Sequence, residues 1–101
     1  MPKKLTKEVT VSNQAGIHLR VSRMLLNEAS RFNSSVHLCK GSASADVRSM
    51  LETLSLGAAP GETLRVEVEG DDDKDAQDAL DAVVALFYAG FDEDVHHAEN
   101  E

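Results

Sequence analysis

The sequence predicts an α+β domain in which a four-stranded, largely antiparallel sheet carries three helices on one face. The expected order is strand, helix, strand, strand, helix, strand, helix. Four short segments alternate apolar and polar residues, which is the period of a half-buried strand. Three other segments repeat apolar residues every three or four positions, as a helix lying on a core does. Because the second and third strands are joined by a tight turn, they must be antiparallel, and one sheet covered by helices is the most economical packing.

The first half of the chain supplies a strand, a helix and a hairpin. These elements are expected at residues 5–11, 21–32, 36–38 and 43–47. A polar loop that ends in Gly16 separates the first strand from the first helix, which is typical of a turn. The helix stops at Asn33, and Lys40 and Gly41 form the turn of the hairpin.

The second half supplies a short helix, the clearest strand and the longest helix, at residues 47–54, 64–69 and 76–87. The short helix is indicated by apolar residues at positions i, i+3, i+4 and i+7, namely Val47, Met50, Leu51 and Leu54. An aspartate-rich run precedes the longest helix and suits its positive end, so we interpret that run as a helix start and not as a metal site. We expect a single domain at residues 1–90 and an acidic, disordered tail at residues 91–101.

Composition and charge exclude several classes of function. The 101 residues include 10 Lys and Arg against 18 Asp and Glu, and the net charge of −8 argues against a nucleic-acid-binding face. We find no apolar run as long as a membrane span and no apolar core of a signal peptide. The single cysteine, Cys39, cannot form an internal disulfide. We therefore expect a cytoplasmic monomer that needs no cofactor or metal ion.

The segment between the first strand and the first helix carries the candidate chemistry. His18 would stand at the start of the helix, where backbone N–H groups lack partners within the helix and attract anions such as phosphate. The same positive end favours an uncharged, nucleophilic imidazole. Arg20 would neutralise part of the charge of a phosphoryl group, and the backbone of Gly16, Leu19 and Arg20 would hold it.

A neutral imidazole that attacks phosphorus gives a phosphohistidine, whose bond is labile enough to pass the group on. Such a carrier needs a nucleophile, anion stabilisers and open access, and this segment supplies them. We find no second group that would act as a general base and no glycine-rich phosphate loop, so we do not expect an enzyme. Spacing alone leaves open that His18 is an ordinary loop or cap histidine.

Two separate segments carry a family resemblance. Residues 16–22 resemble the active-site segment of the HPr family, the histidine-containing phosphocarrier proteins of the phosphoenolpyruvate-dependent phosphotransferase system. Residues 48–51 and 54–57 are similar to the second signature of that family, and Ser49 follows His18 by 31 residues, as the family pattern requires. The resemblance covers about residues 8–86. It implies an open-faced β-sandwich that accepts a phosphoryl group on His18 from enzyme I and passes it to an EIIA-type sugar-transport or regulatory component.

The resemblance also implies a regulatory serine and a docking surface. Ser49 resembles the serine that a dedicated kinase phosphorylates in some branches of the family, so a serine kinase/phosphorylase and a transcriptional regulator are further expected partners. The expected docking residues are Met24, Met50, Leu51, Leu54 and Arg23. We expect Leu51 and Leu54 to be more buried than Met50 and Met24.

Departures from the family pattern keep alternatives open. Val21 replaces a proline in the first turn of the helix, which leaves that turn softer. Glu52 and Asn27 stand where the family often has lysines facing its partners. These changes favour a second hypothesis, an HPr-like regulatory binding module that is controlled by Ser49 phosphorylation and transfers little phosphate. A third is a metabolite-binding or structural domain, which would have a concave pocket and no exposed His18.

Overall fold

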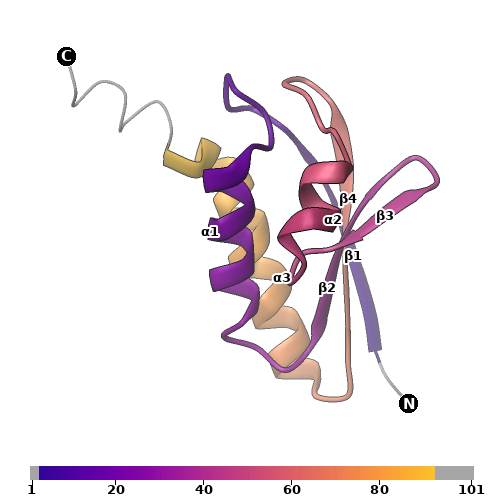
Figure 1. Cartoon of the computed structure of the whole chain (residues 1–101). Helices are drawn as coiled ribbons and strands as arrows, with labels where there is room; N and C mark the ends of the chain where they lie inside the picture. The colour runs from indigo at the N-terminus through magenta and orange to yellow at the C-terminus, as the bar shows by residue number, and fades with distance from the viewer. Residues whose placement is uncertain (1–2, 93–101) are drawn as a thin grey trace.

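The computed structural model describes residues 3–92 and contains four strands, three α-helices and one 3₁₀ turn (Figure 1). Their order is β1 (Lys3–Thr10), α1 (Leu19–Ala29), β2 (Ser35–Lys40), β3 (Ala43–Asp46), α2 (Met50–Ser55), β4 (Thr63–Gly70), α3 (Asp73–Tyr88) and η1 (Gly90–Asp92). The expected sequence of elements is confirmed. α1 begins two residues before the expected start, and α3 begins three residues before it.

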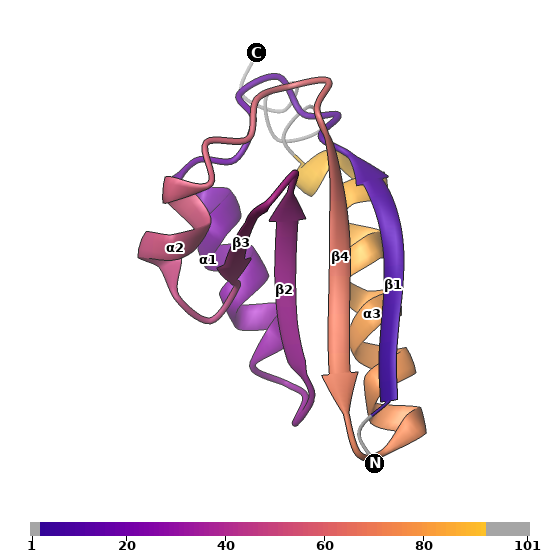
Figure 2. The same ribbon diagram turned by 90° about the vertical axis from the view of Figure 1, so that its right-hand side faces the viewer.

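The strands form one sheet in the order β1-β4-β2-β3, and all three pairings are antiparallel. The helices lie on one face of this sheet and leave the other face open, as Figures 1 and 2 show. The α+β class and the four-stranded antiparallel sheet with helices on one face are therefore confirmed. No helix in the described range 3–92 is long and apolar enough to cross a membrane.

An aliphatic core lies between the sheet and the helices. In β4 the buried residues Leu64, Val66 and Val68 alternate with exposed or half-buried Arg65 and Glu67, because successive side chains point to opposite faces. The side chains of Arg65 and Glu67, which are not buried, form a salt bridge in which Arg65 Nε lies 2.7 Å from the Glu67 carboxylate. This contact holds the pKa of Glu67 below its ordinary value. The alternation thus decides which face of the sheet takes the helices.

The aspartate run caps α3, as expected. Asp72 is the N-cap, and its carboxylate accepts hydrogen bonds from the backbone N–H groups of Lys74 at 2.9 Å and Asp75 at 3.3 Å. Asp75 then reaches across to the loop between α1 and β2, where its carboxylate accepts from the backbone N–H and the hydroxyl of Ser34, at 2.8 and 2.7 Å. These hydrogen bonds lower the pKa of Asp75. They also connect the first turn of α3 to the loop that follows α1.

The expected split of burial around α2 is wrong. Leu51 was expected to be more buried than Met50 and Met24 but is 76% exposed, whereas Leu54, Met50 and Met24 are all half-buried. The expectation counted Val47 as the first residue of the helix, but α2 begins only at Met50 and is six residues long. The helical phase therefore shifts, and Thr53 takes the buried position.

The domain continues past residue 90. Phe91 was expected to begin a disordered tail, but it is 1% exposed and belongs to the hydrophobic core. Its ring packs edge-on against Phe87 with the ring centroids 4.9 Å apart. Because a buried aromatic ring removes a large apolar area from water, it fixes the turn that follows α3. Residues 93–101, the rest of the expected tail, lie outside the described residues.

Candidate functional site

His18 is the N-cap of α1, as the sequence predicted. Its backbone is extended, with φ −124° and ψ −173°, and its carbonyl accepts the first hydrogen bond of the helix from Ser22 N–H at 2.9 Å. The His18 side chain makes no capping hydrogen bond to the helix, and the residue is half-buried. The imidazole is therefore placed at the positive end of α1 without serving as the cap itself.

The loop before His18 is built on Gly16. Gly16 has φ +69°, and a Cβ at this position would lie 2.8 Å from the carbonyl oxygen of Ala58. The next residue, Ile17, donates its N–H to that same oxygen at 3.2 Å. The Gly16 N–H donates to Asn13 O at 3.3 Å, so Gly16 is engaged in its own turn. The expectation that the backbone of Gly16, Leu19 and Arg20 holds phosphate stays a prediction.

A second loop, residues 57–62, packs against the loop before His18 at Gly16 and Ile17. The carboxylate of Glu62 accepts from Ala59 N–H at 2.6 Å and lies 3.1 Å from Lys40 Nζ. These contacts hold the pKa of Glu62 below its ordinary value. Lys40 also donates to the carbonyl of Gly57 at 3.2 Å. The loop that supports Gly16 is thus fastened to the end of β2, which the sequence did not indicate.

Arg20 lies one residue into α1 and reaches the C-terminal turn. Its Nη1 donates to the backbone carbonyl of Phe91 at 3.2 Å and lies 3.3 Å from Met24 Sδ. Arg20 and Phe91 are 71 positions apart in the chain. The guanidinium is therefore oriented by a residue that the sequence analysis had assigned to the tail. The only signal for it was a single aromatic residue after Gly90.

The candidate docking residues lie on two helices that pack against each other, α1 and α2. We call Leu19, Met24, Met50, Leu51 and Leu54 the α1–α2 apolar surface. Leu19 is 54% exposed and was predicted only as a backbone ligand, so its apolar side chain is an addition to the expected set. Arg23 is exposed on α1. An apolar centre with charged neighbours suits a transient interface.

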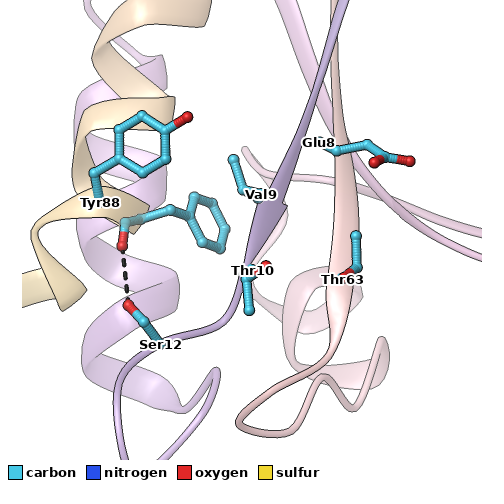
Figure 3. A pocket seen from close by; sticks show the side chains of 7 residues that line it. Glu8, Val9, Thr10, Ser12, Thr63 and Tyr88 are labelled. Carbon is cyan, nitrogen blue, oxygen red and sulfur yellow. Dashed lines mark hydrogen bonds between the residues drawn. The ribbon is translucent and has the colours of Figure 1, made fainter.

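One concave feature lies between β1 and α3, away from His18. An open hollow of about 460 Å³ lies between β1 and the end of α3, and Figure 3 shows Ser12, which donates to Phe87 O at 3.2 Å, and Tyr88 at its edge. Neither His18 nor Arg20 lines it. Among residues 3–92, no group of three His, Cys, Asp or Glu side chains is arranged to hold a metal ion.

Comparison with known families decides the assignment. The family model for the PTS HPr component phosphorylation site matches residues 5–87. The chain belongs to the HPr family. The chain is 37% identical over 90 residues to phosphocarrier protein NPr of Shewanella violacea, which covers 89% of this chain and 96% of the relative. It is 33% identical over 81 residues to phosphocarrier protein HPr of Cupriavidus necator, covering 80% and 91%.

Solved structures of the HPr family share the fold. The crystal structure of HPr from Thermoanaerobacter tengcongensis matches with a TM-score of 0.76 at 28% identity and covers 88% of this chain and 94% of that one. HPr from Bacillus anthracis matches with a TM-score of 0.75 at 27% identity, covering 83% and 96%. The expected family and the expected open-faced fold are therefore confirmed. HPr proteins are phosphocarriers of the phosphotransferase system and are not catalytic enzymes.

Ser49 occupies the N-cap of α2. Its hydroxyl accepts from Glu52 N–H at 3.2 Å, and its carbonyl accepts from the Thr53 hydroxyl at 3.0 Å. The Glu52 carboxylate accepts in turn from Asp46 N–H at 2.9 Å. Regulatory phosphorylation of Ser49 stays a prediction, and a phosphate there would add charge to a helix start that already carries Glu52.

Proposed function

We propose that this HPr-family chain accepts a phosphoryl group on His18 from enzyme I, originally from phosphoenolpyruvate, and passes it to an EIIA-type component in the cytoplasm. The observation that carries the proposal is the position of His18. Its side chain stands at the N-terminus of α1 without capping that helix, and Arg20 follows two residues later. This arrangement supplies a nucleophile and an anion site on an accessible surface.

In the loading step, an unprotonated ring nitrogen of His18 attacks the phosphorus atom of the donor. The new nitrogen–phosphorus bond forms as the bond between the donor and phosphorus breaks, and the donor keeps that electron pair. First-turn N–H groups of α1, including those of Leu19 and Arg20, and the Arg20 guanidinium stabilise the negative charge of the phosphoryl oxygens. Unloading reverses these steps toward a nucleophile on the EIIA-type partner.

Docking would use the α1–α2 apolar surface. An exposed Leu51 beside half-buried Met50 and Leu54 offers apolar area that two different partners can cover in turn. Methionine side chains adapt to different partners because they are flexible and polarisable. Arg23 would add a positive charge on the side of His18. A weak interface of this kind suits a carrier that must leave one partner before it meets the next.

Incubation with enzyme I and phosphoenolpyruvate tests the proposal. We expect an acid-labile, base-stable phosphate on the wild-type chain and none on the His18→Ala variant. The matched control is His37→Ala, because His37 is half-buried on β2, far along the chain from the site. That variant should be labelled like the wild type. An unlabelled wild-type chain, or a full label on His18→Ala, would contradict the proposal.

A further inference from the structure

The turn Gly90–Asp92 is attached both to the core and to the candidate site. The Phe91 ring is 1% exposed and packs against Phe87. The carbonyl of the same residue accepts from Arg20 Nη1 at 3.2 Å. One residue therefore links the hydrophobic core to the Arg20 guanidinium.

The backbone of this turn is unusual. Gly90, Phe91 and Asp92 all have positive φ, at +61°, +55° and +58°. A bulky side chain rarely adopts this left-handed region, and it does so where the surrounding structure compensates. Burial of the Phe91 ring supplies that compensation, and Asp92 N–H closes the turn on Ala89 O at 3.1 Å. The buried ring is thus one of the contacts that hold residue 91 in this conformation, together with the bonds at its carbonyl and at Asp92 N–H.

We propose that Phe91 is a positioning residue for phosphoryl transfer, and that its buried ring holds the carbonyl that orients the Arg20 guanidinium beside the N-terminus of α1. The inference rests on the proposed function of His18 and Arg20. An exposed arginine samples many rotamers, and ordering it when the phosphoryl group arrives would cost entropy. The Phe91 carbonyl supplies that order in advance.

Arg20 is held from two sides. Its guanidinium is a rigid plane of N–H donors, so a hydrogen bond from Nη1 to Phe91 O fixes the direction of the whole group. The contact with Met24 Sδ at 3.3 Å restricts the side chain from the side of α1. Phe91 and Met24 together confine Arg20 between the helix and the C-terminal turn.

A first measurement is independent of phosphoryl transfer. In the full-length chain, ¹⁵N NMR should show the Arg20 side-chain N–H as slowly exchanging, with the signal assigned by its loss in Arg20→Lys. Phe91→Ala should make this N–H exchange fast, whereas Phe91→Leu, which keeps an apolar anchor, should retain slow exchange. Tyr88→Ala is the matched control, because Tyr88 is an aromatic residue at the end of α3 that is 70% exposed. An Arg20 signal that is unchanged in Phe91→Ala would overturn the proposal.

A second measurement uses a double-mutant cycle on the rate of loading by enzyme I. Phe91→Ala should lower that rate about tenfold, because the variant loses the carbonyl position that orients one charge-assisted hydrogen bond of Arg20. In an Arg20→Ala background the same change should alter the rate by less than about twofold, because coupled residues are not additive. Phe91→Leu should restore most of the rate. Graded replacement by Leu and then Val gives the same test if the Ala variant does not fold.

The outcomes separate the two proposals. An equal loss of rate from Phe91→Ala in both backgrounds would assign Phe91 a merely structural role. A faster rate in Phe91→Ala would mean that the carbonyl restrains Arg20 instead of preparing it, which also contradicts the proposal. A wild-type chain that enzyme I does not label would refute the proposed function, while the NMR exchange of Arg20 would still decide whether Phe91 orients it.

Discussion

Replacing Gly16 by alanine tests how the loop before His18 is built. Gly16 has φ +69°, and the added Cβ would lie 2.8 Å from Ala58 O and 3.1 Å from Pro60 Cδ. The left-handed backbone costs a non-glycine residue about 1–2 kcal/mol. The contact with a backbone oxygen forces a local shift, which typically costs about 1–3 kcal/mol. We therefore expect Gly16→Ala to reduce the free energy of unfolding by about 2–5 kcal/mol in all.

Urea unfolding followed by circular dichroism measures this loss. A small domain has about 5–15 kcal/mol of stability, so the variant should still fold. Its melting temperature should fall by roughly 8–40 °C, since each kcal/mol shifts a domain of this size by about 4–8 °C. The variant should also load phosphate more slowly, because the shift moves the backbone that leads into His18.

Gly41→Ala separates the two contributions. Gly41 has φ +59°, but a Cβ there meets nothing within 4 Å. It should therefore carry only the backbone cost of about 1–2 kcal/mol. If Gly16→Ala were no more destabilising than Gly41→Ala, the claim that the loop 57–62 packs closely against Gly16 would be refuted.

Three further predictions concern α3, the docking surface and α2. The hydrogen bonds from Ser34 hold the pKa of the Asp75 carboxyl below its ordinary value. The ionised carboxylate therefore adds to the free energy of unfolding above about pH 4. This added stability is lost as the pH falls through the lowered pKa. Urea unfolding from pH 7 to pH 3 should therefore show a smaller acid loss in Asp75→Asn, and an unchanged pH dependence would contradict this assignment. Leu51→Ser should change the free energy of unfolding by less than about 0.5 kcal/mol, since the side chain is 76% exposed. It should raise the KM for enzyme I several-fold. The control Tyr88→Ser, at another exposed residue, should leave that KM unchanged. An unchanged KM in Leu51→Ser would remove Leu51 from the docking surface. Ser49→Ala should lose about 1 kcal/mol of stability with the N-cap of α2, whereas Ser49→Asp should keep the cap, and equal unfolding midpoints for the two variants would refute the capping role.

The predictions for Leu51 and Phe91 fail for the same physical reason. Leu51 is predicted to be more buried than Met50 because it shares a helical stripe with Val47 in the sequence, yet Val47 precedes the turn that Ser49 caps. Phe91 was assigned to the tail because an isolated aromatic residue in polar sequence shows no periodicity. In both cases the missing information was the position of one segment against another, which a local pattern does not contain.

The sequence by itself determined the order of strands and helices, the position of His18 at the start of α1, and the family. These features depend on hydrophobic period, capping residues and short motifs, which act between near neighbours in the chain. Only the tertiary structure decided that Arg20 meets Phe91, that Gly16 packs beneath Ala58, and that Leu51 faces outward. The first two are contacts between residues far apart in the chain, and all three features exist because the sheet and helices enclose one core that brings distant segments together.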